Sequence, residues 1–351
     1  AIQKEKEELQ KAEDVHKHDI EELARRCYGY YENFKMQHQN DSAAKYIEWR
    51  AMLDTTNVEW QNDAGLFIMD YQARYNDALK YYEIGLQQSV SQFGEMDEWT
   101  ALFYNNIGLV YDSQGDYTKA LEYYQKALGI WGKVFGTEHP DVALSYNNIG
   151  SVYYSQGDYP KALEYLQKAL GIVEKVFGTE HPNVATSYNN IGGVYYSQGD
   201  YTKALEYYHK ALGIREKVFG TEHPDVATSY NNIGLVYSSQ GDYPKALEYY
   251  NKALGILEKV YGTEHPNVAT SYGNIGYMYS SQGDYMRALE YFNKSLTIYE
   301  KIFGAEHSNT IMVREHIKYI NRQMILSDNE KMQEYIFIAK TVDGDTPAKQ
   351  P

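Results

Sequence analysis

A repeat of 42 residues is the feature that most limits what this chain can fold into. From about Tyr104 onward, a glycine recurs at this interval in nearly unchanged surroundings, at positions 108, 150, 192, 234 and 276. The unit from Tyr146 to Ser187 differs from the next at roughly six positions. Such a chain grows by stacking similar units, so its 351 residues need not form two or three globular domains.

The repeat unit predicts two amphipathic helices. The first is expected to begin at His139-Pro140, because proline fits a first turn whose N–H groups lack helical partners. Its apolar stripe, spaced by three or four residues, consists of Val142, Tyr146, Ile149, Val152 and Tyr153. Gly157 is expected to end this helix and Asp158 to cap the second. The buried side of the second helix is predicted to hold Tyr159, Ala162, Leu163, Leu166, Ala169, Leu170 and Ile172, before Phe177-Gly178 closes it.

Two kinds of glycine recur within the helices. Gly150 and Ala162 are expected to be small because the two antiparallel helices approach closely there. A helical glycine costs about 1 kcal/mol relative to alanine, so its recurrence indicates a packing benefit. The second helix carries another glycine, at positions 129, 171, 213 and 255, for which the sequence offers no reason.

The pattern resembles the tetratricopeptide repeat. The family's signature residues correspond to Tyr104, Ile107-Gly108, Tyr111, Gly115, Tyr117, Ala120, Tyr124 and Ala127-Leu128. The usual period of that family is about 34 residues, and the 42-residue version is similar to the repeats of kinesin light chains. The resemblance covers roughly Asn62 to Ile317. It implies an all-α, right-handed α-solenoid of antiparallel helix pairs, the TPR superhelix.

The ends of the chain are less regular. We expect a charged helix or linker (1–19), a divergent helical pair (20–56), a degenerate repeat (57–98), five repeats of 42 residues (99–307), a capping helix (308–333) and a tail (334–351). Glu334–Val342 is rich in β-forming residues. It is either the last helical segment before a disordered end or the first strand of a further domain.

Asparagines form a ladder along the first helices. They lie two and three residues before each recurring glycine: Asn105, Asn106, Asn147, Asn148, Asn189, Asn190, Asn231, Asn232 and Asn274. First helices line the concave wall of a tetratricopeptide superhelix, and an amide can both donate to and accept from a peptide backbone. Kinesin light chains use comparable asparagines, so the resemblance implies peptide binding. The alternative is that these side chains bond to neighbouring turns and stabilise stacking.

The repeats differ most informatively just after the glycine. One position later they hold Leu109, Ser151, Gly193, Leu235 and Tyr277, and four positions later Asp112, Tyr154, Tyr196, Ser238 and Ser280. Variation on a constant framework suggests a graded recognition surface, for which we select Ser151, Tyr154, Tyr196, Leu235 and Tyr277. Drift at exposed positions is the alternative, and second-helix variation at Trp131, Val173, Arg215, Leu257 and Tyr299 favours it.

Charge restricts the partners. The net charge of −15 and the absence of a large Lys/Arg cluster argue against nucleic acid and membrane surfaces. The predicted wall lacks the cations that clamp a terminal carboxylate. We therefore expect a neutral or basic protein or peptide ligand, bound by a monomer in the cytoplasm. Cys27 is the only cysteine, which excludes an intramolecular disulfide and fits a reducing compartment.

Neither a cofactor nor catalysis is expected. The histidines at 139, 181, 223, 265 and 307 occur once per repeat, too far apart to converge on a metal, and are predicted to be N-caps or turn residues. Cys27 is near His16 and His18 in sequence, but on a polar helix. We predict that the chain is not an enzyme.

The sequence thus favours a protein-interaction scaffold. The alternatives are a regulatory or sensor arm of a larger signalling protein and a structural spacer. The charged stretch of residues 1–19 lacks the sustained heptads by which kinesin light chains join their heavy chains. A motor subunit is therefore not predicted.

Overall fold

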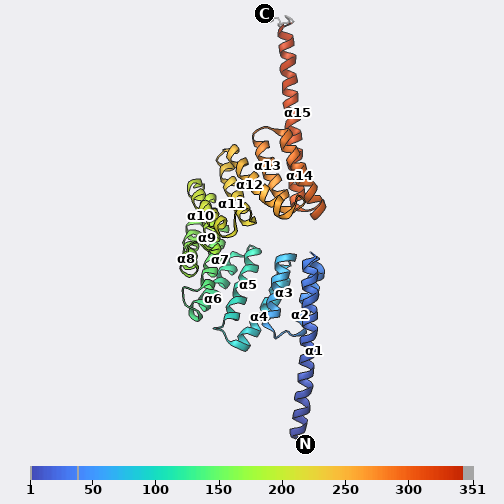
Figure 1. The fold of residues 1–351 in the computed structure, drawn as a ribbon, viewed down its shortest axis with the longest axis vertical. Helices are drawn as coiled ribbons and strands as arrows, with labels where there is room; N and C mark the ends of the chain where they lie inside the picture. Colours follow the sequence, from blue (N-terminus) through green and yellow to red (C-terminus); the bar gives the residue numbers. More distant parts are fainter. Residues whose placement is uncertain (1, 38, 343–351) are drawn as a thin grey trace, which may run out of the picture. The chain divides into compact units, whose positions relative to one another are not determined.

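The computed structural model of the protein describes residues 2–37 and 39–342, with side chains from 15 to 37 and from 39 to 326 (Figure 1). Within these residues all regular structure is α-helical and no strand occurs. The predicted all-α class is confirmed. The chain divides into two compact units, Ala1–Thr179 and Glu180–Pro351.

The first unit contains eight of the described helices. They are α1 (Ile2–Met36), α2 (Asn40–Leu53), α3 (Val58–Gln72), α4 (Tyr75–Phe93), α5 (Glu98–Ser113), α6 (Tyr117–Val134), α7 (Pro140–Ser155) and α8 (Tyr159–Phe177). Consecutive helices pack against each other throughout this unit. It is therefore a stack of helix pairs, as a solenoid requires.

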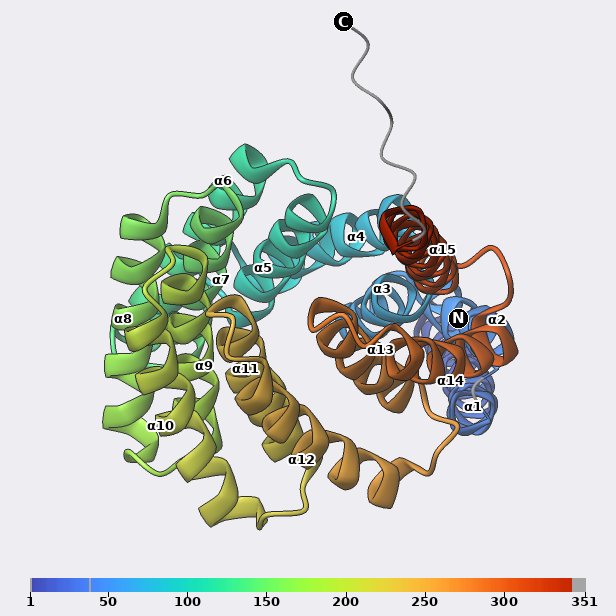
Figure 2. The ribbon, with the colours of Figure 1, turned by 90° about the horizontal axis from the view of Figure 1, so that it is seen from above.

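The second unit continues the same pattern. Its helices are α9 (Pro182–Ser197), α10 (Tyr201–Phe219), α11 (Pro224–Ser239), α12 (Tyr243–Tyr261), α13 (Pro266–Ser281), α14 (Tyr285–Phe303) and α15 (Ser308–Val342). Figure 2 shows α9, α11 and α13 following one side of this stack and α10, α12 and α14 the other. The predicted solenoid of helix pairs is thus observed within each unit.

The repeat's turns follow from its capping residues. The imidazole Nδ1 of His139 accepts a hydrogen bond from the Asp141 N–H at 3.3 Å, with Pro140 in the first turn. Gly157 has a φ of +77°, a conformation that favours glycine. The Asp158 carboxylate then accepts from the Lys161 N–H at 3.3 Å and caps the second helix. All three predicted roles are confirmed.

The first-helix glycine is needed for close packing. A Cβ at Gly150 would lie 2.9 Å from Leu166 Cγ and 3.3 Å from the Ala162 carbonyl oxygen. The predicted close approach is confirmed. The second-helix glycines, by contrast, are exposed, and a Cβ on Gly171 would meet nothing within 4 Å.

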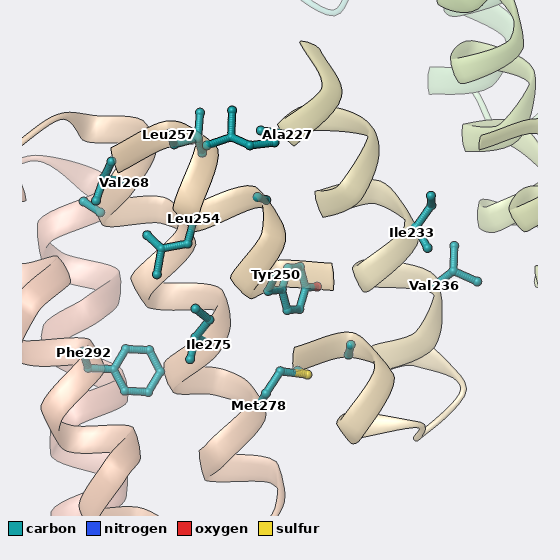
Figure 3. Close-up of a cluster of buried hydrophobic side chains, with 14 of the residues drawn as sticks. Ala227, Ile233, Val236, Tyr250, Leu254, Leu257, Val268, Ile275, Met278 and Phe292 are labelled. Carbon is teal, nitrogen blue, oxygen red and sulfur yellow. The ribbon is translucent and has the colours of Figure 1, made fainter. Parts of the chain in front are cut away.

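Each core forms where the apolar stripes of successive helices meet. In the second unit, Ile233, Ile275 and Tyr250 are at most 3% exposed. Figure 3 shows Tyr250, Ile275, Met278 and Phe292 among the side chains that fill this region between the helices. The core runs from pair to pair, so each repeat depends on its neighbours for burial.

Tyrosines coat the junction between the two helices of a repeat. Tyr153 of α7 stacks on Tyr165 of α8, with ring centroids 5.5 Å apart. The Lys161 and Lys168 ammonium groups each lie 4.9 Å from a ring centroid of this pair. Both rings are half-buried, as suits a side chain with an apolar ring and a polar hydroxyl, and the equivalent stack recurs in the following repeats.

At both ends of the chain the structure takes the helical one of the two predicted alternatives. Residues 2–19 belong to α1, so they form a helix rather than a linker. The backbone of 334–342 continues α15, which corrects the idea of a strand beginning there. The helix extends by intrahelical hydrogen bonds, whereas a strand needs a pairing partner. The rest of the predicted tail, 343–351, lies outside the described residues.

Candidate functional site

The first helices of the repeats form a continuous side of each unit, which we call the wall. In the first unit, α3 contacts α5 and α5 contacts α7 directly. The wall comprises the three first-helix rows selected above: the asparagines, the position after the glycine and the position four after it. The opposite side of each first helix is held in the core by residues such as Ile149 and Val152, both fully buried.

The asparagine ladder is a chain of amide hydrogen bonds between repeats. The second asparagine of a repeat donates from Nδ2 to Oδ1 of the first asparagine in the preceding repeat. This bond is 2.9 Å from Asn148 to Asn105 and 2.7 Å from Asn232 to Asn189. Asn106 donates to Asn62 at 2.8 Å, so Asn62 takes the same place in the degenerate repeat.

Burial divides the ladder into two parts. Asn105, Asn106 and Asn148 are 2%, 4% and 9% exposed, and Asn105 also donates to Asn106 at 3.3 Å. Such amides join the repeats and have little surface for a ligand. The remaining predicted asparagines are half-buried: Asn147, Asn189, Asn190, Asn231, Asn232 and Asn274. The geometry therefore gives part of the ladder the stacking role that was the alternative to peptide binding.

The ladder is interrupted at the last repeat. The Asn231 Oδ1 is buried and has no hydrogen-bond partner in the described part of the chain. The equivalent bond, from Asn274 to Asn231, is thus not formed. Gly273 stands where the other four repeats carry their first asparagine.

The variable wall positions are more accessible than the asparagines. Tyr154, Leu235 and Tyr277 are 40%, 40% and 52% exposed, whereas Ser151 is half-buried. Tyr196 is half-buried, and its hydroxyl lies 2.9 Å from the Ser239 hydroxyl of the next repeat. The structure thus places three large apolar side chains on the wall in contact with solvent.

Asp112 adds an acidic group to the wall. Its carboxylate is half-buried on α5 and forms no hydrogen bond or ion pair with the described residues. Burial raises its pKa above the ordinary value of 3.8. A desolvated carboxylate of this kind would gain from an added cation or N–H donor.

Lysines on the second helices already have acidic partners. Lys126 pairs with Glu122 at 2.6 Å within α6, and the equivalent pair recurs through α14. Lys301 reaches Glu264, beside the His-Pro turn of its repeat, at 2.6 Å. These exposed pairs leave little uncompensated positive charge on that side. On the wall, the Asp112 carboxylate has no such partner among the described residues.

The second-helix variation has a packing explanation. Trp131, Val173, Arg215, Leu257 and Tyr299 are all at most 8% exposed. Arg215 donates to the Ser229 hydroxyl and the Asp225 carbonyl of the next repeat, at 2.8 and 3.2 Å. Changes at this position therefore alter contacts between repeats, whereas Tyr154, Leu235 and Tyr277 on the wall are exposed.

The histidines and the cysteine have structural surroundings. His181 and His223 cap their helices by accepting a backbone N–H at 3.2 Å, as His139 does. The prediction that these histidines are N-caps is confirmed. Burial raises the pKa of the Cys27 thiol, although the nearby Arg26 acts in the opposite direction. The raised pKa lowers the fraction of Cys27 that is a thiolate. No metal-ligating cluster occurs among the described residues.

The comparisons with known proteins identify the repeat. The sequence profile of the tetratricopeptide repeat family matches residues 60–133, 99–175, 141–217, 183–259, 239–301 and 272–317. Together these matches span more than half of the chain. No curated protein sequence matches it.

Solved structures show the same fold. BtubC (BKLC) from P. vanneervenii is 22% identical, with a TM-score of 0.54 over 67% of this chain and 92% of that chain. A variant of a putative kinesin light chain from Podospora anserina, described as having nearly identical TPR-like repeats, is 24% identical. Its TM-score is 0.50, over 56% of this chain and 93% of that one. No helix in the described residues is long and apolar enough to cross a membrane.

Proposed function

This chain belongs to the tetratricopeptide repeat family, and from that premise we propose that it binds a segment of a partner protein along the wall. Tetratricopeptide repeats generally form protein-interaction scaffolds rather than catalytic sites. The observation that carries the proposal is the exposure of Tyr154, Leu235 and Tyr277 on an otherwise repeated framework. Exposed aromatic and aliphatic groups of this kind anchor protein interfaces.

The asparagines contribute unequally in this proposal. The buried amides around Asn105 and Asn148 hold the repeats in register and act on the ligand only indirectly. The half-buried amides of α9, α11 and α13 contact the ligand. An amide that makes one ladder bond keeps a second N–H and a second lone pair, which suit the backbone of an extended peptide.

Charge supports a neutral or basic segment. The chain carries −15 overall, and the Asp112 carboxylate on α5 lacks a cationic partner among the described residues. A partner lysine or arginine at this point would replace part of the lost hydration and lower the Asp112 pKa again. An acidic segment would bind more weakly, because its negative charge would face the negative charge of this chain.

A peptide display library tests the proposal. Peptides selected on the wild type are titrated against a wall variant, Tyr154→Ser/Leu235→Ser/Tyr277→Ser, which uses a residue that other repeats hold in these two rows. The matched control is Val176→Ser/Val218→Ser/Val260→Ser on α8, α10 and α12, where the valines are 43–45% exposed.

The expected result is a loss of about tenfold or more in affinity for the wall variant alone, because truncated interface anchors commonly cost over 1 kcal/mol each. Circular dichroism verifies equal helix content in all three proteins. Equal affinity of the wall variant and the wild type would place binding elsewhere. Failure to select any peptide would favour a spacer.

A further inference from the structure

The last repeat contains a pocket whose lining includes residues that differ from those of the preceding repeats. It lies between α13, α14 and α15 and has a volume of about 180 Å³. Gly273 and Asn274 of α13, Ser295 of α14 and His316 of α15 contribute to its lining. The exposed Tyr277 and Met312 also line it, so it opens beside the wall.

Two repeat-specific residues shape this pocket. Gly273 replaces the asparagine of the other four repeats, and Ser295 replaces the alanine found at 127, 169, 211 and 253. A Cβ on Gly273 would lie 3.7 Å from Ser295 Oγ. An asparagine side chain at 273 would therefore extend toward Ser295 and fill the space. Glycine at position 273 thus leaves the space open, and serine at position 295 adds a hydroxyl beside it.

The pocket's polar groups lack partners. Ser295 is completely buried, yet its Oγ has no hydrogen-bond partner in the described structure. The half-buried Asn274 amide does not make the ladder bond of the earlier repeats, because Asn231 Oδ1 has no partner in the described structure. The other buried hydroxyl, of Tyr299, is already paired with Thr270 Oγ1 at 2.7 Å. An unpaired buried polar group is unfavourable, and a ligand that supplies the missing hydrogen bond would gain affinity from it.

The lining defines the class of ligand. It includes Phe292, Val313 and Met312 and contains no lysine, arginine, aspartate or glutamate, so it favours a neutral group. The His316 ring stacks on Phe292 with centroids 5.2 Å apart and supplies a flat side wall. A cavity of about 150 Å³ holds benzene. The volume here therefore suits one aromatic ring with a small polar substituent.

We propose that this pocket binds a neutral phenol group, as in a tyrosine side chain of the partner segment. The ring would lie against Phe292 and His316, and its hydroxyl would reach Ser295 Oγ and the Asn274 amide. This inference rests on the proposed function for the identity of the partner, but not for the chemistry of the pocket. Tyr277 at the rim connects the pocket to the wall.

The test uses p-cresol, the side-chain analogue of tyrosine, and toluene, which lacks its hydroxyl. Binding is followed by the methyl NMR signals of ¹³C-labelled methionine, with Met312 in the pocket and the exposed Met96, between α4 and α5, as the internal reference. Ser295→Ala and Gly273→Asn both introduce residues that other repeats hold, so both should fold. Gly255→Asn, the same change at an exposed glycine of α12 where a Cβ would meet nothing within 4 Å, is the matched control.

We expect p-cresol to shift the Met312 signal saturably and to bind more tightly than toluene. Ser295→Ala should weaken the affinity for p-cresol about fivefold, which corresponds to the loss of one neutral hydrogen bond. The affinity for toluene should stay unchanged. Gly273→Asn should abolish the binding of both compounds, whereas Gly255→Asn should leave the binding of both unchanged. The absence of a saturable Met312 shift would overturn the proposal, as would an unchanged preference for p-cresol in Ser295→Ala. Because no peptide is involved, these outcomes are independent of whether the wall binds a partner.

Discussion

The two helices of a repeat each carry a recurring glycine, and the two glycines lie in opposite surroundings. A Cβ on Gly108 of α5 would lie 2.7 Å from the ring of Tyr124, which is fully buried in α6. A Cβ on Gly129 of α6 would meet nothing within 4 Å. Both recur at 42-residue intervals with similar fidelity. Recurrence therefore does not distinguish a packing requirement from a position copied along with the rest of the unit.

The largest expected effect concerns the first-helix glycine, which is closely packed. Gly108→Ala should destabilise the protein by about 1–3 kcal/mol, since the added methyl overpacks a core that the Tyr124 ring already fills. The gain in helix propensity offsets only part of this loss. Urea unfolding followed by circular dichroism measures the change. A midpoint equal to that of the wild type would show that α5 and α6 separate easily.

The amide ladder should be the next most sensitive feature of the first helices. Asn148→Ala leaves Asn105 Oδ1 without the donor that lies 2.9 Å away, in a buried place, so we expect a loss of about 1–3 kcal/mol. A double-mutant cycle with Asn105→Ala isolates the pair from other effects. Additive single effects would contradict a direct bond between these side chains.

Gly129→Ala tests the second-helix glycine, which has open space around it, and should stabilise the protein where Gly108→Ala destabilises it. Its Cβ has space in α6, and alanine is favoured over glycine in a helix by about 1 kcal/mol. We therefore expect a higher urea midpoint, with the same slope as the wild type. The last repeat already has Thr297 at the equivalent position. A destabilised Gly129→Ala protein would reveal a role for this glycine that its surroundings do not show.

The comparison also explains what the sequence could predict. Capping by His139 and Asp158, the close approach at Gly150 and the all-α class follow from local rules, and the structure confirms them. The bond from Asn148 to Asn105 joins residues 43 positions apart, and its formation depends on how two first helices stack. The sequence placed these asparagines on one side of the helix but could not distinguish a ligand contact from a bond between repeats. The pocket at Ser295 depends in the same way on α15, which is not a repeat helix.

The smallest expected effect concerns two carboxylates in the same repeat, whose pKa values move in opposite directions. Burial raises the pKa of Asp112 on the wall, whereas hydrogen bonds from Lys119 lower that of Asp116 at the turn. As pH rises above 3.8, the unfolded state loses its Asp112 proton first, so this group reduces stability until its raised folded pKa is passed. Asp116 instead adds stability above 3.8, which is lost as pH falls through its lowered folded pKa.

Asp112→Asn should therefore raise the unfolding midpoint at pH 7 and change it little near pH 3, where both states of the wild type are protonated. Asp116→Asn should lower the midpoint at pH 7, because asparagine still caps α6 but no longer pairs with Lys119. Urea titrations of the three proteins at both pH values measure these differences. An equal or lower midpoint for Asp112→Asn at pH 7 would mean that the wall carboxylate is already compensated. In that case the argument for a basic partner segment at α5 would fail, while the apolar anchors at Tyr154, Leu235 and Tyr277 would stand.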